Sequence, residues 1–293
     1  MQLRDEDHAL SGEAAPRVLS LQSHVVHGYV GNRAAVFPLQ LLGFEVDYIN
    51  SVQFSNHTGY NTVKGQILDG EQLWSIVEGL EQNGLLAGYD YLLTGYIGSE
   101  SFLRTVLNIV QKLKEYNPNL IYICDPVLGD LGPGLYVPKD LISIYREEMM
   151  KVCSVITPNC FEAQLLSDTG SITSMSDAIE ACDSLHSKGV EKVVITSLEL
   201  EPGCITMVCS LGVSTDRWSK KYYINLPQIQ GHFTGTGDLT TAMLLAWMHN
   251  HPYDLPSALE KVGAVLQAVR VLNIFVLEHC CRLFFKTFVV LFE

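Results

Sequence analysis

The sequence predicts an α/β protein with one doubly wound, mostly parallel central sheet and helices on both of its faces. From residue 17 onward, short apolar runs alternate with segments of helical spacing, and no linker interrupts the alternation. Most of the runs are apolar on both faces, as buried parallel strands are. The chain has 293 residues, of which 47% are hydrophobic and 17% charged, so it can bury a large core.

The predicted elements follow one another in a regular order. Parallel strands are predicted over residues 18–22, 46–50, 89–94, 120–124, 154–157 and 192–196. Helical spacing lies between them, over residues 34–42, 70–82, 100–116, 140–151, 162–167 and 176–187. Residues 203–210 and 221–226 are suited to antiparallel edge strands. One sheet and one domain account for the whole pattern.

Polar and aromatic residues gather where these strands end. In a sheet of this kind, ligands bind at the carboxyl ends of the strands. Five of the six strands are followed by such residues, in order Ser23 and His24, Gly95 and Tyr96, Asp125, Thr157 with Asn159, and Thr196 with Ser197. The sequence therefore predicts a ligand site along this edge of the sheet.

The segment Gly235-Thr236-Gly237-Asp238 directly precedes an apolar helical run. Glycines let the backbone expose its N–H groups, and the positive end of the following helix points at the same place, which makes an anion site. An aspartate there repels phosphate but is well placed to take a proton from an attacking hydroxyl. The alternative for an isolated segment of this kind is a turn in which Asp238 caps the helix.

Three carboxylates, Asp125, Asp130 and Glu162, are predicted near the anion site. Carboxylate oxygens hold Mg²⁺, which bridges phosphate oxygens, although each acid alone is equally typical of a turn or a cap. Asn159 and Thr196 can donate hydrogen bonds to phosphate. The sequence contains no Walker A motif, no GxGxxG after the first strand and no Ser-His-Asp arrangement.

Net charge and cysteine spacing narrow the possible binding partners and the cellular compartment of the protein. The formal net charge of −13 argues against nucleic-acid binding. The eight cysteines show no CxxC spacing, which is typical of reduced thiols in a cytoplasmic protein. Residues 1–16 are polar and acidic and are predicted to form a disordered extension. No membrane span is expected, because charged residues interrupt the apolar segment 270–293.

Longer blocks of the sequence resemble a known family. GTGD with a strand-end Asp125 and the Thr-Pro-Asn segment resembles the ribokinase-like superfamily of small-molecule kinases. Within it, the chain is similar to pyridoxal kinases of the animal type in the blocks SLQSHVVHGYVGN (20–32), NSVQFSNHTGY (50–60), LTGY (93–96), CDPVLGD (124–130) and ITPN (156–159). The resemblance covers about residues 17–269 and implies a three-layer ribokinase-like sandwich over that range.

The resemblance implies a vitamin B6 pocket in the first half of the sheet edge. Ser23 would hydrogen-bond the pyridine nitrogen, and Thr58 the ring substituents, with His57 beside it. Val52, Phe54 and Tyr96 would supply apolar and stacking surface, and Tyr136 would come from a flap over the site. The substrates implied are ATP and the B6 vitamers pyridoxal, pyridoxine and pyridoxamine.

The resemblance also implies a nucleotide and cation site in the second half. Asp238 would deprotonate the 5′-hydroxyl, and the amides of Gly235, Thr236 and Gly237 would stabilise the transferred phosphoryl group. Mg²⁺ and a monovalent cation, K⁺ or Na⁺, are implied cofactors, and a homodimer is the implied assembly. The remaining residues carried over are Asp125 and Asn159 along the triphosphate, Asp130 and Glu162 near the cations, Thr157 and Thr196 at the monovalent ion, Thr196 and Ser197 at the phosphates, and Phe233 with Thr234 on the nucleotide side.

The sequence departs from the family in two places. The flap, residues 130–137, and the region after Ser197 are short, and residues 270–293 form an atypical apolar tail. From the tail we expect lower stability or weaker ATP affinity than a family member with the usual ending, which melting and the Michaelis constant for ATP measure. Two alternatives stay open: a hydroxymethylpyrimidine-type kinase, and a weak or silent isoform that binds vitamers or a partner.

Overall fold

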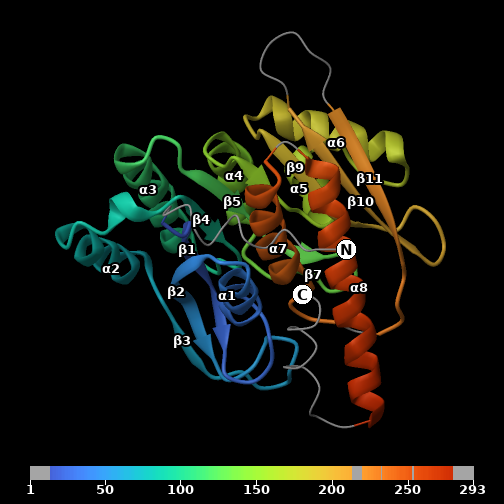
Figure 1. The fold of residues 1–293 in the computed structure, drawn as a ribbon, viewed down its shortest axis with the longest axis horizontal. Coiled ribbons are helices and arrows are strands. Elements are labelled where there is room, and N and C mark those ends of the chain that lie inside the picture. The colour runs from blue at the N-terminus through green and yellow to red at the C-terminus, as the bar shows by residue number, and fades with distance from the viewer. Residues whose placement is uncertain (1–13, 213–219, 232, 253, 280–293) are drawn as a thin grey trace, which may run out of the picture.

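The computed structural model describes residues 14–212, 220–231, 233–252 and 254–279. The expected apolar tail lies outside them from residue 280 onward, as does most of the expected N-terminal extension. Figure 1 shows a central sheet with helices on both faces. The predicted α/β class with a mostly parallel sheet is confirmed.

The sheet has nine strands in the order β11-β10-β9-β8-β5-β4-β1-β2-β3. Six central strands run parallel, and they are β2 (Glu45–Phe54), β1 (Arg17–Val25), β4 (Tyr91–Thr94), β5 (Ile121–Cys124), β8 (Val155–Ile156) and β9 (Lys192–Leu198). Antiparallel strands form both edges, with β3 (Gly65–Ile67) at one and β10 (Cys204–Leu211) and β11 (Lys220–Pro227) at the other.

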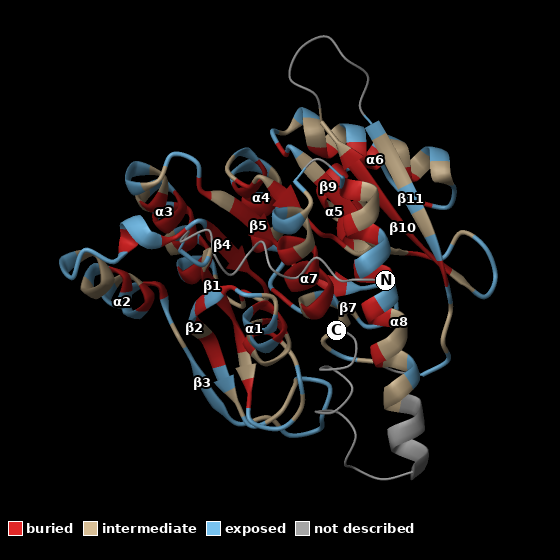
Figure 2. Cartoon of the chain, in the orientation of Figure 1, coloured by how far each residue is buried: buried red, intermediate tan, exposed pale blue. Residues whose placement is uncertain are grey.

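Two hydrophobic cores separate the helices into two layers. Helices α1 (Asn32–Leu41), α7 (Thr236–Asn250) and α8 (Leu255–His279) pack on one face of the sheet. The other face carries α2 (Gly70–Gln82), α3 (Glu100–Tyr116), α4 (Asp140–Glu147), α5 (Cys160–Ser167) and α6 (Met175–Ser187). Figure 2 shows the buried residues concentrated in the sheet between these layers. No helix among the described residues is long and apolar enough to cross a bilayer.

Local sequence explains how the helices form. Asp69 caps α2, Ser99 caps α3 and Ser174 caps α6, each accepting a backbone N–H of the first turn. Helix α3 buries one stripe, which includes Phe102, Val106 and Val110. Helix α7 differs, because all eight residues from position 239 to 246 are buried. It lies between α1 and α8 and is covered on every side.

Several element ends differ from the expectation. Strand β1 continues to Val25 with a register shift between Gln22 and His24, so Ser23 lies within the strand instead of after it. Strand β9 likewise includes Thr196 and Ser197, because pairing with β10 holds it to Leu198. The expected helix 140–151 divides into α4 and a 3₁₀ turn, Met149–Lys151.

The chain topology predicts a ligand crevice at the carboxyl end of β1. From β1 the chain moves to β2 on one side, and it later returns through β4 on the other side of β1. Helix α1 covers one face while α2 and α3 cover the opposite face. A reversal of this kind is a switch point, where open α/β sheets bind their ligands. The starts of α1 and α7, which are in contact, lie beside it.

The side chain of Asn32, at the start of α1, forms hydrogen bonds with residues of β1 and β2. Its amide donates to Gln22 O, Ile49 O and Asn50 Oδ1 at 3.3, 3.1 and 2.9 Å, and its Oδ1 accepts the Ser20 hydroxyl at 2.8 Å. The side chain is 2% exposed, so water cannot replace these partners.

We expect Asn32→Ala to lower the free energy of unfolding by about 2–3 kcal/mol, because buried acceptors lose their donor. Denaturant titration followed by circular dichroism measures the change. Asn83→Ala is the matched control, since Asn83 is exposed and donates to a single carbonyl, Gly79 O. An equal loss in both variants would contradict a special role for the buried network.

Candidate active site

The start of α7 is packed directly against the loop that leads into α1. Gly235 is the N-cap of α7, and its φ of +80° is in the left-handed region. A Cβ at this position would lie 1.9 Å from Tyr29 O, so only glycine fits. No side chain caps this helix start. Its first N–H groups therefore face the crevice as an anion site.

Asp238 is held at the same contact. The backbone N–H groups of Gly31, the N-cap of α1, and of Asp238 itself lie near enough to the carboxylate to favour its ionised form. Burial raises the pKa of Asp238 above its ordinary value, and these N–H groups oppose the rise. Since the N-cap is Gly235, Asp238 does not occupy the capping position of α7. The alternative interpretation of a simple cap is wrong.

Asp125 follows β5 and faces the first turn of α7. It is 5% exposed, and a Cβ on Gly237 would lie 3.6 Å from its Oδ2. Burial raises the pKa of Asp125 well above its ordinary value, and repulsion from Glu162 and Asp238 adds to the rise. A hydrogen bond from Thr241 opposes it. Asp125 is therefore close enough to Glu162 and to Asp238 to be repelled by both charges.

Glu162 and Asn159 connect the start of α5 to the loop after β5. Glu162 Oε1 accepts the N–H of Leu128 at 2.9 Å, and its Oε2 accepts the N–H of Asn159 at 2.9 Å. Asn159 caps the N–H of Glu162 and donates to Gly129 O at 2.8 Å. Burial raises the pKa of Glu162 to about 8, against the opposing effect of these N–H groups.

The loop after β5 continues as a small hairpin that the sequence pattern did not reveal. Strands β6 (Gly129–Asp130) and β7 (Gly134–Leu135) pair antiparallel, and Tyr136 N–H donates to Leu128 O at 2.8 Å. The predicted flap residue Tyr136 is 45% exposed at the end of this hairpin. Asp130 is also exposed, and its carboxylate accepts the N–H of Leu131 at 2.9 Å.

The predicted hydroxyl residues lie on neighbouring strands. Thr157, after β8, pairs its Oγ1 with Thr241 Oγ1 of α7 at 2.8 Å. Thr196 N–H donates to Pro158 O at 2.9 Å, and Ser197 follows it in β9, half-buried. Phe233 and Thr234 precede Gly235, with Phe233 half-buried and Thr234 exposed.

The donor set of this half of the site suits a hard cation. In the described part of the chain, no Lys or Arg forms an ion pair with Asp125, Glu162 or Asp238. Buried carboxylates together with threonine hydroxyls fit Mg²⁺ or an alkali cation. The described residues nevertheless contain no preformed group of three or more His, Cys, Asp or Glu side chains able to hold a metal.

The other predicted pocket residues occupy the ends of β1, β2 and β4, which are adjacent in the sheet. Ser23 and Val52 are buried, and Ser51 Oγ donates to Tyr96 O at 2.9 Å. Phe54 is half-buried at the end of β2. The loop that follows carries His57, whose Nδ1 accepts the N–H of Gly59 at 3.1 Å, and the exposed Thr58.

Comparison with known proteins identifies the family. The family model described as phosphomethylpyrimidine kinase matches residues 85–274. Pyridoxal kinase of Arabidopsis thaliana is 52% identical over 86% of this chain and 81% of its own length, and that of Homo sapiens is 49% identical over 86% and 84%. The chain belongs to the pyridoxal kinase family. A structure titled as Leishmania donovani pyridoxal kinase with ADP and pyridoxine aligns with a TM-score of 0.79 at 42% identity, covering 86% of this chain and 84% of that one.

Family membership confirms the ribokinase-like fold and identifies the chain as a kinase. Sequence reasoning did not single out three residues that the structure places against the start of α7 or within it, which are Tyr29, Gly31 and Thr241. Tyr29 and Gly31 lie in a block that carries the resemblance, but only the three-dimensional contact with α7 shows their purpose. Thr241 lies in a helix that is apolar on all sides, so the sequence pattern does not show which of its residues face the site.

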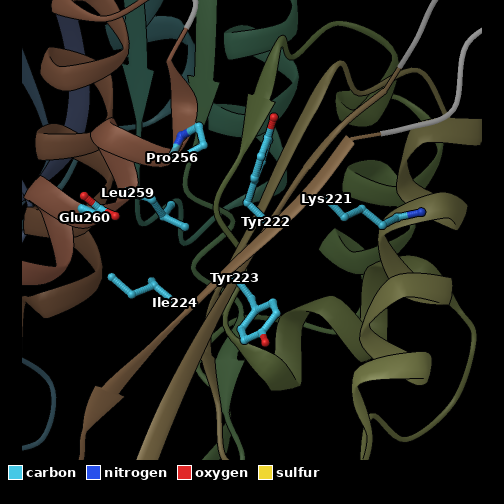
Figure 3. A pocket seen from close by; sticks show the side chains of 7 residues that line it. All are labelled: Lys221, Tyr222, Tyr223, Ile224, Pro256, Leu259 and Glu260. Atoms are coloured by element: carbon cyan, nitrogen blue, oxygen red, sulfur yellow. The ribbon is translucent and has the colours of Figure 1, made fainter.

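A pocket of about 300 Å³ lies apart from these residues, between β11 and α8 (Figure 3). Its lining comes from the two elements alone and is Lys221, Tyr222, Tyr223, Ile224, Pro256, Leu259 and Glu260. It contains none of the residues that the sequence predicts for the site.

We expect Gly235→Ala to lower both stability and turnover sharply, because the new Cβ would meet Tyr29 O as well as an unfavourable φ. Gly43→Ala is the matched control: Gly43 has φ +87° and nothing within 4 Å of an added Cβ. The control should cost about 1 kcal/mol from strain alone. Melting temperatures that fall equally in both variants would show that the contact with Tyr29 is unimportant.

Asp125→Asn should raise the melting temperature of the ligand-free protein at pH 8, because it removes an ionised, repelled and buried charge. A carboxyl whose pKa is higher in the folded than in the unfolded protein lowers the free energy of unfolding as pH rises above its unfolded-state pKa. The increase in melting temperature should therefore be smaller at pH 5 than at pH 8. Differential scanning calorimetry at both pH values measures it. A gain that is the same at pH 5 and pH 8 would contradict the electrostatic cause.

Proposed function

We propose that this chain transfers the γ-phosphoryl group of ATP to the 5′-hydroxyl of pyridoxal, pyridoxine and pyridoxamine. The observation that carries the proposal is the close contact of Gly235 with Tyr29 O, which brings the uncapped start of α7, with Asp238 in its first turn, against the loop that leads into α1. A base and an anion site are thereby adjacent, as transfer to an alcohol requires. Relatives solved with ADP and pyridoxine or pyridoxamine support the choice of substrates.

The proposed reaction is a direct in-line displacement. Asp238 takes the proton of the 5′-hydroxyl as its oxygen attacks the γ-phosphorus, and the bond from that phosphorus to the β,γ-bridging oxygen breaks. The products are the 5′-phosphate ester and ADP. The N–H groups of Gly235, Thr236 and Gly237 stabilise charge on the phosphoryl group in flight. Tyr136, on the hairpin, helps to exclude water that would otherwise accept the group.

The vitamer is proposed to bind at the ends of β1, β2 and β4. Ser23 bonds the pyridine nitrogen, and Thr58 the ring substituents beside His57. Val52, Phe54 and Tyr96 provide the apolar surface. The switch point of the sheet supports this half of the site as the ring pocket, because it adjoins the carboxylate of Asp238 through Gly31.

ATP is proposed to occupy the second half, along β5, β8 and β9. Asp125, Asn159, Thr196 and Ser197 lie along the phosphates, and Phe233 with Thr234 lies on the nucleotide side. We assign Mg²⁺ to Asp130 and Glu162, and a K⁺ or Na⁺ ion to Thr157 and Thr196. When bound, these cations supply positive charge that neutralises the phosphates and the buried carboxylates.

We also propose a cytoplasmic homodimer. The six cysteines of the described residues are free, and five of them are buried, which fits a reducing compartment. Phe37 and Leu41, one turn apart on α1, are each 39% exposed and offer an apolar surface to a second copy. Light scattering of the purified chain tests the dimer by its molar mass.

Asp238→Asn should reduce turnover at least about a thousandfold while pyridoxal still binds, because the amide cannot accept the proton. Formation of pyridoxal phosphate from pyridoxal and Mg-ATP, followed by absorbance, measures the rate. Asp177→Asn is the matched control, since Asp177 occupies the corresponding third position of α6, is half-buried and lies outside the proposed site. Turnover retained by the Asp238 variant would rule out its role as base.

The rate should also depend on pH in a defined direction. The base acts when ionised, so kcat/KM should fall as pH is lowered through the pKa of Asp238. Because burial raises that pKa, the fall should begin above the ordinary carboxylate range. A pH profile of kcat/KM that stays flat down to pH 4 would contradict it.

A further inference from the structure

Arg270 is a half-buried cation with no counter-charge among the described residues. It lies on α8, and its guanidinium carbon is 5.8 Å from the centre of the Phe233 ring. Its Nε is buried and has no hydrogen-bond partner, and burial lowers the pKa of the guanidinium. Within the described residues, Arg270 forms no ion pair.

This arrangement is unfavourable for folding. A guanidinium moved out of water loses hydration, and a buried donor without an acceptor costs further free energy. The chain has 32 acidic residues against 19 basic ones, so a carboxylate partner would be easy to supply. The contact with the ring of Phe233 compensates in part, but it leaves the N–H donors unused.

The position of Arg270 shows what could use those donors. Phe233 precedes the anion turn by two residues and is the residue that we place on the nucleotide side. Helix α8 packs beside α7, whose start forms that turn (Figure 1). Arg270 is therefore next to the residue that we place on the nucleotide side of the site.

We propose that Arg270 is a nucleotide-binding residue that holds the purine base of ATP or ADP. The guanidinium stays stacked on Phe233, and its free N–H groups donate to the acceptor nitrogens of the purine ring. The proposal rests on the proposed nucleotide site. It adds a residue of α8 that the sequence analysis did not place in the site.

The test compares Arg270→Met with the unaltered full chain by titration calorimetry and melting. Methionine keeps the apolar stem and removes the desolvated charge. The variant should melt at a higher temperature without ligand, yet bind ADP about tenfold more weakly. Adenosine, which has no phosphate, should lose affinity by the same factor. In steady-state assays the KM for ATP should rise while kcat is unchanged.

Lys261→Met is the matched control. Lys261 lies on the same helix with its ammonium 4.4 Å from the centre of the Trp247 ring, so the variant also removes one charge from an aromatic contact. It is exposed, and ADP and adenosine affinities should stay within twofold of the unaltered chain.

Three results would overturn the proposal. An ADP affinity within twofold of the unaltered chain would remove the contact, and a lower ligand-free melting temperature would make Arg270 a packing residue. Weaker ADP binding with unchanged adenosine binding would place the guanidinium on a phosphate instead of the base. Failure of the proposed function would give a different result. The affinities for ADP and adenosine would still fall in Arg270→Met, but the unaltered chain would form no pyridoxal phosphate from pyridoxal and Mg-ATP.

Discussion

The contact between the starts of α1 and α7 is the constraint on which the rest of the site depends. Gly235 approaches Tyr29 O so closely that no other residue fits, and the N–H of Gly31 lies near enough to favour the ionised form of Asp238. Segments two hundred residues apart in the chain are thereby brought into main-chain contact. This contact sets where the backbone of Asp238 and the proposed anion site lie relative to the loop before α1, which is the positioning that a proton acceptor needs.

The charges around this contact are arranged for ligands and against the stability of the empty protein. Repulsion from Glu162 and Asp238 raises the cost of ionising the buried Asp125, burial raises the pKa of Glu162 and of Asp238, and the half-buried Arg270 lies beside the ring of Phe233. The carboxylates lie on the side of the site proposed for the cations, and Arg270 lies on the side proposed for the purine ring of the nucleotide. Binding of the cations and the nucleotide would relieve the repulsion at the carboxylates and the missing hydrogen bond of Arg270. Part of the binding free energy therefore comes from removing unfavourable interactions of the ligand-free protein.

Helix ends and strand order were predictable to different degrees. The bounds of α2 and α3 agree with the sequence pattern, because Asp69 and Ser99 are strong local caps. The ends of β1 and β9 were wrong, since pairing with neighbouring strands carries them past the polar residues. Strands β3, β6 and β7 have two or three residues, too few to show a period. The predicted site residues recur at the strand ends, but the role of Gly31 depends on a contact with α7 that no local pattern encodes.

The two edges of the sheet limit how copies of this protein can associate. Strand β3 has three exposed residues, so it offers a very short ladder to an approaching strand. Strand β11, at the other edge of the described sheet, opens with the exposed Lys220 and with Lys221, which is paired with Asp183, and charged residues on an edge strand hinder pairing with another strand. Edge-to-edge growth of the sheet is thus discouraged at both ends. Self-association is left to helical surfaces, which close into discrete assemblies more readily than into fibres.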